Sequence, residues 1–158
     1  MPATAPTSKT ARPQPGQGVR VLTFRLYNQV FALPVADVLQ IIAPLPLTPV
    51  PQAPGFVEGV INLQGQVVPV VNLRKRFGLA PAIERSDERL IVATLGEQGS
   101  VALRVDTVRD VETIPAESIA PPPALVAGPQ GAAYIKGISN HNNRLIIHVD
   151  PRAIFEAA

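Results

Sequence analysis

The sequence predicts an all-β fold of barrel-like architecture, in which one structural unit is used twice. Residues 58–77 recur without a gap as residues 136–155, at a spacing of 78 residues. A weaker match relates residues 31–41 to 101–111 at a spacing of 70 residues, so the later copy needs an insertion. Similarity at a fixed spacing marks repeated supersecondary units. Short apolar runs separated by frequent glycine and proline favour strands over long helices.

The first copy begins after a proline-rich segment. Residues 1–18 contain four prolines and almost no large apolar side chain, which is typical of a disordered tail. Alternating polarity over residues 19–26 predicts a half-buried strand. A turn at Tyr27 and Asn28 leads to a second strand over 29–33, and Pro34 can open a short helix that ends near Gln40.

The second part of this copy is predicted to be a hairpin followed by a helical turn. Prolines between residues 44 and 54 exclude a long helix there. Two β-branched runs, 56–63 and 66–71, are joined by Gln64 and Gly65, a pattern that favours a hairpin. After it, LRKRFGL reads as one helical turn with Gly78 as its stop.

The second copy repeats this order after a polar link over residues 80–88. The interpretation is a domain over residues 19–158, with one subdomain at about 19–80, a second at about 88–150, and a C-terminal helix at 151–157. The expected elements of the second copy are strands at 89–95 and 99–105, a short turn or helix at 106–110, a hairpin of 134–139 with 144–149 whose turn is His141, Asn142 and Asn143, and the helix that Pro151 opens.

Length and charge limit the function classes. A chain of 158 residues is about one domain, and two small copies are expected to pack together and form a binding groove at their junction. Two of the 14 cations, Lys9 and Arg12, lie in the tail, so the body balances the 12 acids and lacks the positive surface of a nucleic-acid or membrane binder. With no cysteine and no long apolar span, the sequence fits a cytoplasmic protein.

The side chains that could carry chemistry are few. There is no Cys or GxSxG elbow to act as nucleophile, and no HxxH, HExxH or CxxC spacing for a metal. We therefore assign no catalytic residue, no metal site and no cofactor, and give His141, His148, Asp106 and Asp110 structural or solvated roles. The five phenylalanines fit core faces better than base-stacking platforms. A protein-binding module is preferred over an enzyme, and a barrel that binds single-stranded nucleic acid is a weaker alternative.

The hairpin and helix over residues 59–79, GVINLQGQVVPVVNLRKRFGL, closely resemble the signature of the CheW family. The stretches FRLYNQVFALPVADVLQII, DERLIVATL and VALRVDTVRDV resemble other parts of that family, so the likeness covers about residues 19–156. It implies two intertwined five-stranded SH3-like barrels with short helices. It also implies a non-enzymatic adaptor that couples the cytoplasmic tip of a chemoreceptor to the regulatory domain of a CheA-type histidine kinase, and that can meet other CheW-like proteins.

The resemblance also points to contact residues. On this basis the expected partner-binding residues are Val38, Gln40, Ile41, Gly59, Asn62, Gln64 and Gly65. Gly59 and Asn62 recur as Gly137 and Asn140, so a structural reading stands beside the functional one for both. In the structural reading the glycine is a strand residue that barrel geometry requires, and the asparagine shapes a turn.

Three positions depart from the commoner family pattern. Gln40 stands where the family has glutamate, Gln64 where it has arginine, and Asn72 where it has aspartate. Each departure removes a charge, and glutamine cannot supply the cationic fork of arginine. The hypothesis is therefore a divergent array that governs pili, gliding or second-messenger output, or a variant specialised for particular neighbours. A scaffold that binds no receptor is a further alternative.

Overall fold

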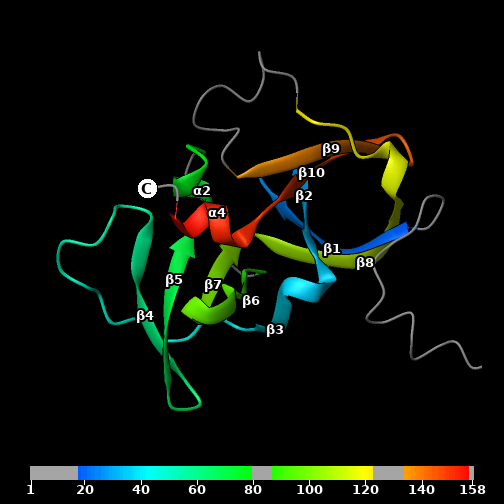
Figure 1. The fold of residues 1–158 in the computed structure, drawn as a ribbon. Helices are drawn as coiled ribbons and strands as arrows, with labels where there is room; N and C mark the ends of the chain where they lie inside the picture. The colour runs from blue at the N-terminus through cyan, green and yellow to red at the C-terminus, as the bar shows by residue number, and fades with distance from the viewer. Residues whose placement is uncertain (1–17, 80–86, 123–133, 157–158) are drawn as a thin grey trace, which may run out of the picture.

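The computed structural model describes residues 18–79, 87–122 and 134–156, and it confirms the all-β class. The tail expected over residues 1–18 and the centre of the link over 80–88 lie mostly outside these ranges. Ten strands form two five-stranded sheets, which Figure 1 shows as two groups. In spatial order, sheet A holds β8 (Thr107–Pro115), β1 (Gly18–Leu26), β2 (Gln29–Pro34), β10 (Arg144–Val149) and β9 (Ile135–His141). Sheet B holds β3 (Val38–Ile42), β6 (Arg89–Thr94), β7 (Ser100–Val105), β5 (Gln66–Asn72) and β4 (Val57–Leu63).

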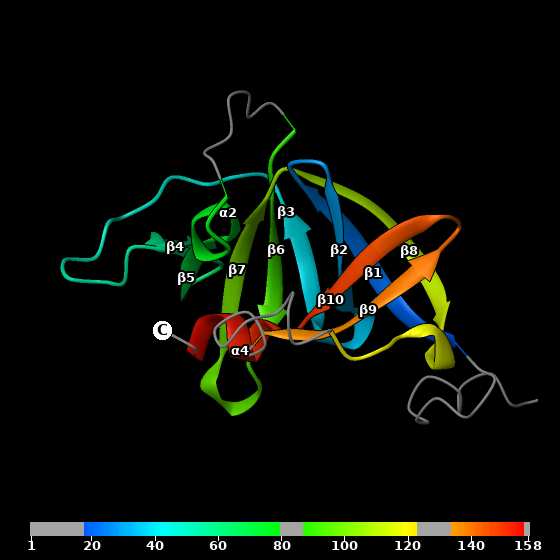
Figure 2. The ribbon, with the colours of Figure 1, turned by 90° about the horizontal axis from the view of Figure 1, so that it is seen from above.

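The two copies exchange strands, so that neither sheet belongs to one copy. Sheet A combines β1 and β2 of the first copy with β8, β9 and β10 of the second, and sheet B combines β6 and β7 with β3, β4 and β5. Equivalent pairings recur in both sheets, including the parallel pairs of β10 with β2 and of β5 with β7. The sheets therefore divide the chain differently from the ranges 19–80 and 88–150. The chain crosses from one sheet to the other after β2 and again after β7 (Figure 2).

The two predicted hairpins are confirmed, and their turns have the same geometry. Gln64 and Gly65 join β4 to β5 with φ angles of 54° and 87°, and Asn142 and Asn143 join β9 to β10 with 55° and 62°. Positive φ at both central residues is the type I′ turn that suits the twist of a hairpin. His141 was expected within the second turn, but it is the last residue of β9.

Two expected helices are shorter or absent. The helix expected from Pro34 to Gln40 is a single 3-10 turn, η1 (Val35–Asp37), because the chain continues as β3 at the edge of sheet B. The turn or helix expected at 106–110 is the start of β8 instead, because this segment pairs with β1. A bulge interrupts that pairing, and the hydroxyl of buried Thr23 both accepts from the Asp110 N–H and donates to the Asp110 carbonyl. Tertiary pairing outweighs the local pattern here.

The short helical elements that follow the strands complete the described fold. Helix α2 (Leu73–Arg76) follows β5 and helix α4 (Pro151–Glu156) follows β10, as the repeat predicted. The Arg76 Nε donates to the Ile154 carbonyl at 2.9 Å and so joins the two helices. Two further 3-10 turns are η2 (Gly96–Gln98), between β6 and β7, and η3 (Ala116–Ser118), after β8.

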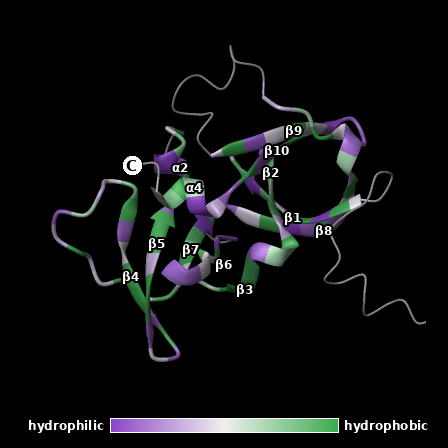
Figure 3. Ribbon diagram, in the orientation of Figure 1, coloured by the Kyte–Doolittle hydropathy of each residue, from purple (hydrophilic) through white to green (hydrophobic). Residues whose placement is uncertain are grey.

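The apolar core explains why the two sheets stay together. One cluster of buried side chains lies within each sheet's barrel, and the largest cluster takes residues from both sheets. In Figure 3 hydrophobic segments run along β4, β5 and β7, while the β4–β5 turn is hydrophilic. The shared cluster includes a run of stacked rings, in which neighbouring centroids of Phe24, Phe31, Phe77 and Tyr134 are 5.8, 5.3 and 4.9 Å apart. The junction that was expected to form a groove is thus filled by core side chains over much of its extent.

Candidate partner-binding site

The residues expected to contact partners fall into two groups on sheet B. Val38, Gln40 and Ile41 lie on β3, and the others lie on β4 and its turn into β5. Strands β3 and β4 are the two edges of this sheet in its spatial order, so the strand pairing does not bring the groups together. Gln40 and Gln64 are both exposed, which leaves these two departures from the family pattern available to a partner.

Gly59 is buried, and the structure gives it a packing role. A Cβ atom at Gly59 would lie 2.5 Å from the carbonyl oxygen of Thr48, and the φ angle of Gly59 is +155°. Thr48 and Val60 exchange two backbone hydrogen bonds of 2.9 Å, which tie the proline-rich connection to β4. Gly137 is crowded in the same way by the Ala120 carbonyl, beside an equivalent bridge between Ala120 and Ile138. The glycine recurs because a bridged backbone segment passes close to it in both copies.

Asn62 shapes the first hairpin turn. Its Oδ1 accepts a hydrogen bond of 2.9 Å from the Gly65 N–H, while both residues remain exposed. Such a local side-chain bond stabilises a tight turn. Asn62 and Gly65 therefore hold the exposed Gln64 side chain at the tip of the hairpin.

Exposed apolar side chains stand at equivalent positions of the two copies, and the sequence interpretation named only Ile41 among them as a contact residue. Val67 and Leu145 are 72% and 58% exposed, and Ile41 and Val111 are 42% and 49% exposed. Single exposed apolar residues are common on protein surfaces. Here both members of each pair stay apolar without contributing to the core, so the barrel itself does not require them. The repeat alignment contained this signal, since it already matched these residues.

Sheet B also contains a buried network of charges. Arg104 on β7 donates from Nε to Glu58 Oε1 at 2.7 Å and from Nη1 to Glu88 Oε1 at 3.0 Å. Asn72 donates from Nδ2 to the other Glu58 oxygen at 2.6 Å, and its Oδ1 caps α2 by accepting from the Lys75 N–H. One buried cation thus faces two carboxylates, and the neutral amide of Asn72 supplies a further donor.

Restoring the commoner aspartate at Asn72 is therefore expected to destabilise this chain. The variant Asn72→Asp places a second carboxylate where an amide now donates to Glu58, and two ionised carboxylates at that distance repel each other. We expect a loss of about 2 to 3 kcal/mol in the free energy of unfolding at pH 7. Because one carboxyl group can hold a proton in acid, the loss should shrink near pH 4.

Denaturant unfolding at both pH values measures this effect, with Asn62→Asp as the matched control. Asn62 is exposed and acts as an acceptor toward Gly65, a role that aspartate can keep. Equal stability of the Asn72→Asp variant and the unaltered chain at pH 7 would contradict the assigned network.

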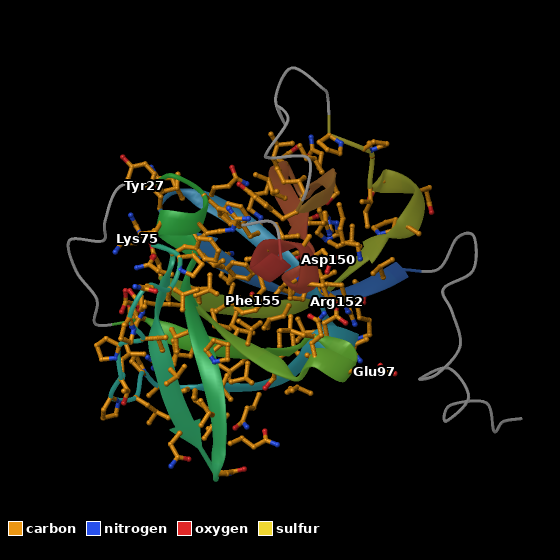
Figure 4. All side chains as sticks on the ribbon, turned by 60° about the vertical axis from the view of Figure 1, so that its left-hand side comes forward. Tyr27, Lys75, Glu97, Asp150, Arg152 and Phe155 are labelled. Atoms are coloured by element: carbon orange, nitrogen blue, oxygen red, sulfur yellow. The ribbon has the colours of Figure 1, made fainter. Side chains whose placement is uncertain are left out.

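A helix arginine lies at each of the two crossings between sheets. Arg74 of α2 binds both oxygens of Asp106, with 2.8 Å between Arg74 Nε and Asp106 Oδ1, and the Tyr27 N–H donates to the same carboxylate. Burial works to raise the pKa of Asp106, but the hydrogen bonds from Arg74 and Tyr27 outweigh it and lower that pKa. The equivalent arginine, Arg152 of α4, lies 3.8 Å from Asp37 of η1. Figure 4 shows Arg152 beside Asp150, apart from Tyr27 and Lys75.

The pair of His148 and Ser139 resembles a base and a nucleophile but lacks the properties of a catalytic pair. His148 Nε2 lies 2.8 Å from the Ser139 hydroxyl, and both residues are buried in sheet A. Burial, with a smaller effect of Lys136, lowers the pKa of His148 to about 4, so the imidazole is neutral at pH 7. A buried pair without access to substrate fits a structural role.

His148 should make the stability of the fold depend on pH. Its folded-state pKa is below the ordinary 6.5, so the unfolded chain takes up the proton first and stability falls as the pH drops from 6.5 toward 4. We expect this residue to account for about 2 to 3 kcal/mol over that window. In His148→Gln that part of the loss should disappear, as measured by unfolding at several pH values. Parallel curves for the variant and the unaltered chain would disprove the assignment.

No group of three or more His, Cys, Asp or Glu side chains in the described ranges could hold a metal ion. Among the same residues, no helix is long and apolar enough to cross a membrane.

Comparison with known proteins agrees with this arrangement. A family model described as CheW-like domain matches residues 20–158. The chain is 30% identical over 141 residues to "Chemotaxis protein CheW" of Treponema pallidum, covering 87% of this chain and 82% of the relative. It is 32% identical to "Protein FrzA" of Myxococcus xanthus, covering 73% and 70%. Its structure is similar to that of the scaffolding protein TtCheW from Thermoanaerobacter tengcongensis, with a TM-score of 0.80, 32% identity, and coverage of 88% of this chain and 93% of the other.

Proposed function

The chain belongs to the CheW-like family, and from that premise we propose that it is a non-enzymatic adaptor coupling chemoreceptors to a CheA-type histidine kinase. The observation that carries the proposal is the set of exposed apolar residues at equivalent positions of the two copies, Ile41 with Val111 and Val67 with Leu145. An adaptor needs at least two contact surfaces, and a duplicated fold offers a related surface twice. In this role the protein acts in the cytoplasm, where receptor arrays at the inner face of the membrane recruit it.

The contact residues expected from the sequence all lie on sheet B. Val38, Gln40 and Ile41 on β3 would meet one partner, and Gln64 at the hairpin tip would meet another, with Asn62 and Gly65 fixing its position. Exposed aliphatic side chains contribute most to such contacts, since each one fully buried is worth about 1.5 to 3 kcal/mol. Gly59 would act indirectly by allowing the backbone to pack beneath the hairpin.

Binding measurements with purified components test the proposal. The variants Ile41→Glu and Val67→Glu are each expected to weaken binding to the receptor-tip fragment or the kinase regulatory domain at least tenfold, because a buried contact gains an unpaired charge. Val50→Glu is the matched control, since Val50 is 43% exposed but lies in the connection before β4, outside the equivalent pairs.

The proposal fails if the unaltered chain binds neither fragment, or if it binds both but does not change kinase autophosphorylation in the presence of receptor. If the chain binds the kinase domain but not the receptor-tip fragment, the alternative of a scaffold that binds no receptor is favoured.

The neutral side chain at Gln64 supports a divergent array. If the cognate partner has lost the acid that meets the family arginine, Gln64→Arg buries an unpaired cation and should weaken kinase-domain binding about tenfold. Gln52→Arg, at another exposed position, is the control. An unchanged affinity of Gln64→Arg in a calorimetric titration would count against a partner specialised for glutamine.

A further inference from the structure

An arginine-lined hollow lies at one end of sheet A. It has a volume of about 410 Å³ and lies between the β1–β2 turn, the start of β8 and the β9–β10 hairpin. The residues that line it include Arg25, Asn28, Gln29, Arg109, Arg144 and Leu145. We refer to it as the arginine hollow. None of its residues belongs to the contact groups on sheet B.

The arginines of this hollow have unused hydrogen-bonding capacity. Among the described residues, the buried side-chain polar atoms without a hydrogen-bond partner are the Nε atoms of Arg109 and Arg144, and both residues line this hollow. Glu112 accepts from Arg144 Nη2 at 3.1 Å and so balances one of the three cations. The ion pairs of the described ranges include none with Arg25 or Arg109, and Arg25 acts on the Asp106 carboxylate only through a weaker electrostatic effect. Buried donors without acceptors are rare and call for a physical explanation.

The duplication shows that the barrel does not need these arginines. From the strand registers, the residues of sheet B that correspond to Arg25, Arg109 and Arg144 are Thr94, Leu39 and Gln66. A hollow of about 430 Å³ occupies the equivalent place between the β6–β7 connection and the β4–β5 hairpin, and no charged residue lines it. The same architecture therefore forms at the other end without a cation.

We propose that the arginine hollow docks an acidic segment of a partner protein. Carboxylates of that segment would bind Arg25 and Arg109, and an apolar neighbour would cover Leu145, which is 58% exposed. Arginine beside exposed aliphatic surface is the composition of a protein interface. A phosphate site would more often use backbone amides of a glycine-rich turn, and no glycine lines this hollow. The inference deepens the proposed function and rests on it for the partner being a protein.

The probe for this inference is a synthetic peptide of alternating Glu and Leu, compared with a Gln and Leu peptide of the same length. The unaltered chain should bind the acidic peptide at least tenfold more tightly than the neutral one. The double variant R25Q/R109Q should lose most of that preference, whereas Arg20→Gln, which changes an exposed arginine on β1, should keep it. NMR mapping on the unaltered chain should place the acidic peptide at the β1–β2 turn and the β9–β10 hairpin.

Three results would overturn the inference: an acidic peptide that binds R25Q/R109Q as it binds the unaltered chain, shifts mapped to another surface, or full displacement by millimolar inorganic phosphate, which would indicate a small-anion site. Receptor and kinase binding are measured on the same samples. If receptor and kinase binding persist but the acidic peptide does not bind, this inference alone is wrong. If the acidic peptide binds but neither receptor nor kinase does, the proposed function alone is wrong.

Discussion

Replacing Gly59 with alanine is expected to lower the free energy of unfolding by about 3 to 5 kcal/mol, since steric overlap and backbone strain each cost about 1 to 3 kcal/mol. The added Cβ would lie 2.5 Å from a backbone oxygen that cannot rotate away, and the φ angle of +155° strains any side chain. Both penalties act on the bridge between Thr48 and Val60, which closes sheet B over its proline-rich connection. Denaturant unfolding of the purified variant measures the loss.

Two other glycines provide matched controls for this result. Gly55→Ala should be nearly neutral, because no atom lies within 4 Å of the added Cβ and no positive φ is involved. Gly137→Ala should fall between the two, because its Cβ meets the rotatable Ile119 Cγ2 at 2.7 Å and the Ala120 carbonyl at 2.9 Å. If Gly59→Ala folds as stably as Gly55→Ala but loses partner binding, Gly59 is a contact residue and its structural role is wrong.

Replacing Arg104 with methionine is expected to lower the free energy of unfolding by about 3 to 5 kcal/mol, because it removes the guanidinium that the carboxylates of Glu58 and Glu88 share. Glu58 and Glu88 lie 2.7 and 3.0 Å from the Arg104 guanidinium, and the exposed fractions of their side chains are only 16% and 6%. Arg20→Met, at an exposed position, should change stability by no more than about 0.5 kcal/mol.

A compensated variant separates the charge effect from lost packing. In R104M/E58Q/E88Q no uncompensated buried charge remains, so most of the stability should return. Thermal unfolding of the single and triple variants makes the comparison. A triple variant that is no more stable than Arg104→Met would show that the alkyl packing of Arg104, and not its charge, supports sheet B.

Local patterns in the sequence predicted the strands and hairpins well. The type I′ turn at Gln64 and Gly65 follows from two β-branched runs separated by two residues, and the helix after β5 follows from LRKRF and its glycine stop. These features depend on neighbours in the chain. The short turn or helix expected at 106–110 was wrong because that segment is a strand only through its pairing with β1, about 85 residues earlier in the chain.

The exchange of strands could not be derived from periodicity, because alternation shows which face of a strand is buried but not which strand lies beside it. The network of Arg104 was also missed, since its four members, Glu58, Asn72, Glu88 and Arg104, come from separate parts of the sequence. The arginine hollow was hidden for the same reason. The repeat alignment already showed that the second copy has Arg144 and Arg109 where the first copy has Gln66 and Leu39.

Both the differences and the agreements between equivalent residues of the two copies are therefore informative. Differences between copies mark the arginine hollow, whereas agreement at Val67 and Leu145 marks exposed apolar residues that the core does not use. Gly59 and Gly137 agree for a third reason, which is the close passage of another backbone. The exposure of each residue in the folded chain distinguishes these three cases, and a single sequence does not give that exposure.

The strand exchange has a consequence for synthesis on the ribosome. Strands β1 and β2 are complete at Pro34, but their neighbours in sheet A begin only at Thr107. At translation rates of about 5 to 20 residues per second, both edges of this hairpin stay unpaired for several seconds. Sheet B can assemble first, because all its strands have been made by Val105. The nascent chain is thus expected to fold from its middle outward, and its first strands are among the last to be buried.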